Sequence, residues 1–290
     1  MVSRGYRLSF TRSRTLLGVG LMIVAMLIVP LADGLAKYLS ASHSPVFLSW
    51  ARYAAGTVFV LPALVFARGH LRLTPAQLPS QVLRTVFLAA AMTLYFMAVA
   101  RVPLADALGA YFVAPIVATV LAALVLRERL SRRKVVAVAL GFVGALLVVR
   151  PGGVMDIGMA YALAAGLLMA GYLVATRMAA TASSPFVTLL FQYLLGTLLL
   201  TPLAVFAWRT PSAEALWLIL GMGLFSAASH LASIYAFRFA QASTLSPLVY
   251  VELISATIFG FAVFGDFPSV LTWLGIAVIV LGGLSLIERR

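Results

Sequence analysis

The chain has 290 residues, of which 63% are hydrophobic and 10% are charged. Soluble domains average about 45–50% apolar and about 25% charged residues, so this composition excludes a water-soluble globular fold. The formal net charge of +13 would suit a nucleic-acid partner, but the basic residues lie in short loops between apolar runs, and that distribution is a membrane-topology signal.

Long apolar segments follow one another along the whole chain. They lack strict alternation, and about twenty apolar residues let a helix cross a bilayer with its backbone amides satisfied, so helices are expected rather than a β-barrel. The predicted fold class is an all-α integral membrane protein of about ten transmembrane helices. The spans are expected near residues 16–37, 47–67, 82–100, 104–126, 135–149, 157–176, 186–207, 215–237, 245–264 and 270–287.

The first apolar run follows several arginines, a pattern that also occurs in signal peptides. This run is long for a signal core and contains Pro30 and Asp33, so we expect the first membrane helix instead. Lys and Arg collect on the side of the N-terminal tail, where we also count Arg84 and the basic loop 127–134. The positive-inside rule therefore predicts a cytoplasmic (inner) membrane protein with both termini in the cytoplasm.

An internal repeat appears when the chain is compared with itself at an offset of about 140 residues. Bland apolar sequence would give scattered Ala and Leu matches, whereas here Pro, Gly and Tyr match in one register. The pairs include Ser44 with Ser184, Tyr53 with Tyr193, Gly56 with Gly196, Thr57 with Thr197, Pro62 with Pro202 and, after a slip of two, Glu128 with Asp266. We expect two repeats, residues 1–150 and 151–290.

Each expected repeat holds five spans, and an odd number makes the second copy enter the membrane from the opposite side. The loop 127–134 is rich in Lys and Arg, whereas its counterpart 265–269 has none, as the positive-inside rule predicts for inverted copies. Inverted repeats suit alternating access, in which two similar halves open a central site first to one face and then to the other.

The chain resembles the drug/metabolite transporter superfamily, in its ten-helix branch of two EamA-type repeats. The residues that carry the resemblance are Pro115, the run 126–130, Gly141 and Gly144, and in the second copy the run 264–268, Gly275 and Gly282. Asp266 departs from the usual glutamate. The resemblance implies structural roles for these motif residues, a cavity between the first four helices of each half, and small-metabolite transport, most similar to YddG-like exporters of aromatic and neutral amino acids.

Polar residues at membrane depth are the first candidates for a substrate cavity. Ser226, His230 and Ser233 share one helical face, either in a cavity or with His230 bonded to a neighbouring helix. Gln192 and Arg52 occupy equivalent positions of the repeat. Arg52 is expected either to hold a carboxylate or to extend towards the outer interface.

The intramembrane acids are candidates for coupling or gating. Glu252 is expected to be a proton carrier, a partner for a substrate ammonium or a structural contact, while Tyr250 on the opposite face lines the cavity. Asp33 either pairs with Lys37 one helical turn later or acts as a gate beside Pro30.

Tyr172, Tyr95 and Trp50 are the aromatic cavity candidates. Together with few fixed charges, they favour a substrate that is a zwitterion with an apolar side chain. The expected function is a carrier that exports neutral or aromatic amino acids. The alternatives are a transporter of another metabolite or drug, cationic or nucleoside-like, or less directly a channel or a membrane scaffold.

Enzyme activity is not expected. The chain has no cysteine, and His43 and His70 lie in loops on opposite sides, so no nucleophile and base pair is evident. No cofactor, metal or nucleic acid is expected, and the absence of a phosphate-binding glycine loop disfavours a nucleotide-driven pump. The expected partners are the lipid bilayer and a small-molecule substrate, with the oligomeric state open and a monomer allowed.

Overall fold

The structure is a computed structural model that describes residues 12–64, 75–125, 132–149, 156–179, 185–239, 248 and 251–285. Within these ranges the secondary structure is helical. The first half contains α1 (Arg12–Leu39), α2 (Pro45–Val60), η1 (Leu61–Leu64), η2 (Pro75–Gln77), α3 (Leu78–Val99), α4 (Leu104–Tyr111), α5 (Ala114–Val125) and α6 (Arg132–Val149). The second half contains α7 (Ile157–Ala179), α8 (Pro185–Phe206), α9 (Ala213–Phe239), α11 (Val251–Phe264) and α12 (Val270–Ser285).

Several of these helices match the dimensions of a bilayer. Within the described ranges, five helices are long and apolar enough to cross a membrane, and shorter apolar helices lie at 104–118, 251–264 and 270–282. Large apolar side chains cover much of the outside of the bundle, as exposed Phe206, Trp217 and Leu198 illustrate. The predicted class of an all-α, multi-helix membrane protein is confirmed.

The fourth expected span is not continuous. It consists of α4 and α5, which are separated at Phe112 and Val113. Pro115 has no backbone N–H, so it cannot donate to the carbonyl of Tyr111 one turn earlier. That carbonyl instead faces α7, where a Cβ added to Gly166 would lie 2.8 Å from it. The expected single helix over 104–126 is therefore wrong, and proline chemistry explains the interruption.

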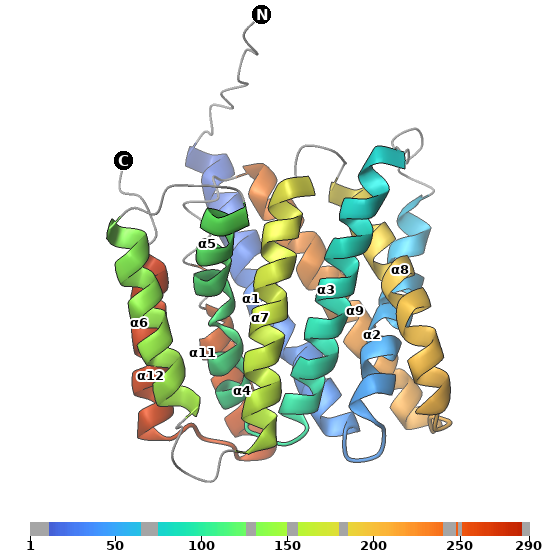
Figure 1. The fold of residues 1–290 in the computed structure, drawn as a ribbon. Helices are drawn as coiled ribbons and strands as arrows, with labels where there is room; N and C mark the ends of the chain where they lie inside the picture. Colours follow the sequence, from blue (N-terminus) through green and yellow to red (C-terminus); the bar gives the residue numbers. More distant parts are fainter. Residues whose placement is uncertain are drawn as a thin grey trace, which may run out of the picture.

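The two halves are arranged in opposite directions. Figure 1 shows that α1 and α7, the first helices of the two halves, run in opposite senses, and that α1 begins at the end of the bundle where α12 finishes. α1 packs along α9 while α7 packs along α3, and α2 packs on α8 as α6 packs on α12. The contact between α1 and α9 thus recurs between their equivalents α7 and α3, and the other two contacts each join a helix to its own equivalent. This pattern is expected when inverted repeats are related by a two-fold axis.

The seam between α2 and α8 brings repeat-equivalent residues face to face. The rings of Tyr53 and Tyr193 have their centroids 5.9 Å apart. Gly56 leaves room for Tyr193, since a Cβ there would lie 2.2 Å from the ring, and Gly196 leaves room for Tyr53 at 2.5 Å. The hydroxyl oxygens of the equivalent residues Thr57 and Thr197 are 3.3 Å apart. The absence of a side chain on each glycine thus permits this close helix approach.

The loop 265–269 closes one end of the bundle. Gly265, with φ of 70°, ends α11 in the left-handed conformation that glycine adopts without strain. The next residue, Asp266, is ion-paired with Lys37 of α1. The Lys37 ammonium also donates to the Val102 carbonyl at 3.1 Å and lies over the ring of Phe264. The expected pairing of Lys37 with Asp33 is therefore wrong, because each of the two residues has a partner on another element.

Candidate functional site

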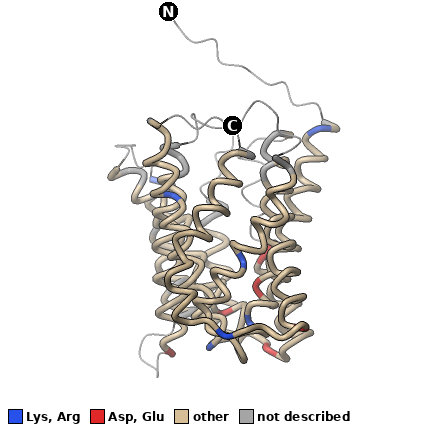
Figure 2. The backbone as a smooth tube through the Cα atoms, turned by 90° about the vertical axis from the view of Figure 1, so that its right-hand side faces the viewer, with Lys and Arg blue, Asp and Glu red and all other residues tan. Residues whose placement is uncertain are grey.

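Charged residues occur inside the bundle as well as at its ends. Figure 2 shows a small group of basic and acidic positions at mid-depth among the described residues. In an apolar surrounding such charges are costly unless they are paired or serve a function. Two arginines of the described residues are buried in the bundle, Arg52 and Arg84, which are 6% and 4% exposed.

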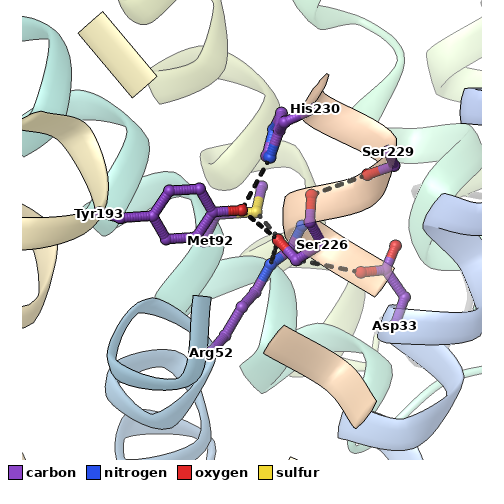
Figure 3. Close-up of polar contacts among 7 residues, drawn as sticks. All are labelled: Asp33, Arg52, Met92, Tyr193, Ser226, Ser229 and His230. Carbon is purple, nitrogen blue, oxygen red and sulfur yellow. Dashed lines mark hydrogen bonds and ion pairs between the residues drawn. The ribbon is translucent and has the colours of Figure 1, made fainter. Parts of the chain in front are cut away.

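The first polar cluster surrounds Arg52 and joins α1, α2, α8 and α9 (Figure 3). The Arg52 Nη1 donates to Asp33 Oδ1 at 3.1 Å, and its Nε donates to Ser226 Oγ at 2.9 Å. The hydroxyl of Tyr193 lies 2.8 Å from Ser226 Oγ and 3.0 Å from His230 Nδ1. We call Asp33, Arg52, Tyr193, Ser226 and His230 the Arg52 cluster.

The cluster decides between the alternatives that the sequence left for Arg52. Its side chain is 7% exposed and is held inside the bundle by the Asp33 carboxylate, which is 5% exposed. The guanidinium also lies 5.6 Å from the centre of the Phe96 ring. Extension of Arg52 to the outer interface is therefore wrong, since its Nη1 donates to the Asp33 carboxylate and its Nε donates to Ser226 inside the bundle.

The second polar cluster surrounds Arg84 and joins α3, α7 and α8. The guanidinium donates to Gln81 Oε1 at 2.8 Å, to the Tyr172 hydroxyl at 3.1 Å and to Gln192 Oε1 at 3.3 Å. Gln81 also donates to Thr188 Oγ1 at 3.3 Å. We call Gln81, Arg84, Tyr172, Thr188 and Gln192 the Arg84 cluster.

The two clusters are related by the repeat. Arg52 of α2 and Gln192 of α8 are equivalent positions, and each is a member of one cluster. Arg52 contacts α1 and α9, while Gln192 contacts the equivalent helices α7 and α3. The inverted repeat therefore places one polar cluster on each side of the α2–α8 seam, with different chemistry in the two halves.

Sequence reasoning missed Arg84 as a site residue. It counted this arginine among the cytoplasmic loop charges, but the side chain is 4% exposed and lies within α3. The available signal was Gln81, which precedes Arg84 by one helical turn and lies on the same face. Because the decisive partners Tyr172 and Gln192 belong to the other repeat, only the fold reveals the cluster.

Three of the expected cavity residues lie apart from both clusters or outside the described residues. Ser233 contacts the Met22 sulfur of α1 at 3.8 Å. Trp50 donates to Thr201 Oγ1 at 3.1 Å and packs against Trp208 with ring centroids 5.7 Å apart. Tyr250 lies outside the described residues.

A third group adjoins the Arg52 cluster through charge. Glu252 is 8% exposed and Tyr95 is 2% exposed. Glu252 interacts electrostatically with both Asp33 and Arg52. Tyr95 packs against Tyr111 with ring centroids 5.1 Å apart. The two candidate coupling acids of the sequence are thus brought near one guanidinium.

These groups provide complementary binding chemistry. Guanidinium groups bind carboxylates through several donors, carboxylates bind ammonium groups, and tyrosine and tryptophan rings supply apolar contact area with a polar edge. Inverted five-span halves with buried polar clusters on either side of their seam define a membrane protein of the transporter class.

Comparison with known proteins identifies the family. Residues 16–150 and 156–287 match the EamA-like transporter family, and the chain belongs to it. The chain is 28% identical over 266 residues to a riboflavin transporter of Vibrio cholerae, covering 90% of this chain and 89% of that one. It is 23% identical to an S-adenosylmethionine uptake transporter of Rickettsia prowazekii, with 93% and 92% covered.

Two further similarities support the same conclusion. The pseudopaline exporter CntI of Pseudomonas aeruginosa is 25% identical, with 94% of this chain and 96% of that one covered. A crystal structure of a protein that is 20% identical shares the fold with a TM-score of 0.64 over 94% of this chain and 96% of the other. With its family and its relatives, the chain is a membrane transporter of small metabolites.

Proposed function

We propose that this protein is an alternating-access carrier in the cytoplasmic membrane, with both termini in the cytoplasm, and that it exports neutral or aromatic amino acids. The observation that carries the proposal is the α2–α8 seam. Thr57 meets Thr197 across it, and a polar cluster lies on each side. Two similar halves related in this way exchange conformations and expose a shared site alternately to each face.

The chemistry of the clusters supports a zwitterion as the cargo. Arg84 is a candidate for the substrate carboxylate because its guanidinium already gathers neutral oxygen acceptors from Gln81, Tyr172 and Gln192. Asp33, which is ion-paired with Arg52, supplies a carboxylate for an ammonium group. Tyr193, Tyr95 and Tyr172 supply aromatic surface for an apolar side chain.

Riboflavin is the second candidate substrate. The similarity to the riboflavin transporter of Vibrio cholerae favours it, and buried tyrosines suit a flat aromatic molecule. The relatives include an uptake transporter and an exporter by name, so direction has to be measured on this chain.

The test is counterflow with purified protein in liposomes. Vesicles loaded with one unlabelled compound are given the same compound in labelled form, in separate experiments with phenylalanine, tryptophan, riboflavin and S-adenosylmethionine. Saturable counterflow of phenylalanine or tryptophan supports the proposal. Counterflow confined to riboflavin or S-adenosylmethionine replaces the amino acid with that cargo, and non-saturable flux or no flux of any compound overturns the carrier.

A further inference from the structure

The charges around the Arg52 cluster do not balance. Asp33 and Glu252 supply two carboxylates, and both are buried. The guanidinium of Arg52 is the cation that interacts electrostatically with Glu252. It is already bonded to Asp33 at 3.1 Å and to Ser226 at 2.9 Å. Within the part of the chain that the structure describes, the one positive charge of Arg52 therefore serves two buried acids.

Among the residues that the structure describes, none donates a hydrogen bond to the Glu252 carboxylate, whereas Asp33 accepts one from Arg52. The backbone oxygen of Glu252 accepts a side-chain hydrogen bond, from Ser255 Oγ at 3.2 Å. The same Ser255 hydroxyl contacts the Met26 carbonyl at 2.9 Å and fixes α11 against α1. A buried carboxylate with no donor costs several kcal/mol when ionised, whereas the neutral acid costs far less.

The groups around Glu252 come from four helices. Asp33 of α1 faces it with like charge and Arg52 of α2 with opposite charge. Tyr95 of α3 and Tyr111 of α4 are neutral phenols that interact with both acids. An ionised Glu252 is thus opposed by Asp33 and by burial, and it is stabilised by Arg52, which is already bonded to Asp33.

We propose that Glu252 is the proton-binding residue that couples transport to a proton gradient. This inference rests on the proposed carrier function. A proton from one side of the membrane binds a carboxylate oxygen of Glu252 and neutralises it, and the same O–H bond breaks when the site faces the other side and the proton leaves to water. The proton is the only species that Glu252 binds and releases in this cycle.

Loss of the proton also connects Glu252 to the Arg52 cluster. Once ionised, Glu252 competes with Asp33 for the guanidinium, and the contacts of Arg52 with Asp33 and Ser226 adjust together. Ser226 is bonded to Tyr193 of α8. A change in the protonation of Glu252 in α11 therefore reaches the seam between the repeats through Arg52 and Ser226.

The transport test compares Glu252→Gln with Glu214→Gln, a matched change of an exposed acid at the start of α9. Each protein is reconstituted and assayed with the labelled compound that the wild type exchanges. Wild type and Glu214→Gln are expected to accumulate or extrude that compound when a pH gradient is applied. Glu252→Gln is expected to retain counterflow at equal pH but to show an accumulation ratio of about 1 under the gradient.

The outcomes separate the two proposals. Wild-type counterflow with no response to the pH gradient overturns proton coupling and leaves the carrier intact, as does a full gradient response in Glu252→Gln. Absence of counterflow in the wild type counts against the carrier itself. Infrared absorption of the purified wild type adds a readout that needs no substrate: a protonated carboxyl band at neutral pH that disappears in Glu252→Gln is expected, and a band that stays unchanged overturns the proposal.

Discussion

Lys37 in the first repeat is ion-paired with Asp266 in the loop that ends α11 of the second repeat. The pair therefore ties the two halves together at one end of the bundle. The side chains are 17% and 27% exposed, so the pair contributes about 1 kcal/mol at most, which corresponds to about fivefold in a two-state equilibrium.

Breaking this pair is expected to favour opening at that end. In Lys37→Ala, a cysteine placed at Met92, beside Arg52, is expected to react about fivefold faster with a membrane-impermeant maleimide added from outside. The chain has no native cysteine, so the readout is specific. The exchanged pair Lys37→Asp with Asp266→Lys is expected to restore the slow rate, and an unchanged rate in Lys37→Ala would show that the pair does not control opening.

The Arg52 and Arg84 clusters are expected to contribute to transport. His230→Ala removes one of the two partners of the Tyr193 hydroxyl, and Gln192→Ala removes an acceptor of Arg84. Loss of one hydrogen bond of about 1 to 1.5 kcal/mol predicts a fall of about tenfold in kcat/KM for flux at normal membrane yield. The exposed residues Leu224 and Leu198, on the same two helices, provide matched alanine controls. Wild-type flux in both test variants would remove these residues from the site.

Arg84 is expected to require its guanidinium rather than its charge alone. Arg84→Lys keeps one positive charge but cannot reach Gln81, Tyr172 and Gln192 together. We expect KM to rise about tenfold in Arg84→Lys and to stay unchanged in the control Arg14→Lys, which alters an exposed arginine of α1. Equal KM values for Arg84→Lys and wild type would show that charge suffices.

The seam between α2 and α8 is expected to be intolerant of added volume. Gly56→Ala places a methyl group 2.2 Å from the Tyr193 ring, whereas a Cβ at Gly20 meets nothing within 4 Å. Overpacking costs about 1–3 kcal/mol, so Gly56→Ala should lower the Tm in detergent by several degrees, and Gly20→Ala should not. A Tm for Gly56→Ala equal to that of the wild type would contradict the close packing at the seam.

The inverted topology predicts opposite labelling of two single-cysteine variants. Arg132→Cys, at the start of α6, is expected to be accessible from the cytoplasm, and Phe267→Cys, between α11 and α12, from outside. Intact cells and inverted vesicles labelled with an impermeant reagent distinguish the two sides. Labelling of both cysteines from the same side would overturn the inverted arrangement.

The sequence predicted the helices and the duplication because these leave periodic or repeated signals. Tyr53, Gly56 and Thr57 match Tyr193, Gly196 and Thr197, and the structure shows that these pairs meet at the seam. The repeated glycines and tyrosines predicted a contact because each glycine leaves the space that the tyrosine of the other repeat fills.

The partners of charged residues were less accessible to sequence reasoning. Asp33 and Lys37 have the spacing of a helical ion pair, yet their partners lie on other elements. Lys37 and Asp266 are 229 positions apart in the chain, and Arg84 and Gln192 are 108 apart. Spacing along one helix does not show whether a charged residue pairs with a neighbour on that helix or with a distant residue, because helix packing decides which side chains meet. Pro115 marked the interruption of span four, but only the packing of α7 shows where the released carbonyl lies.

The reciprocal fit of each tyrosine to the opposite glycine bears on the ancestry of the chain. A five-span precursor inserted in both orientations would have formed the whole seam as a symmetric dimer, with one tyrosine and one glycine each used twice. Joining two copies in one chain lets paired positions differ, and Arg52 of α2 and Gln192 of α8 are such a pair. A single chain with two copies can therefore carry different side chains at equivalent positions, which a symmetric dimer cannot.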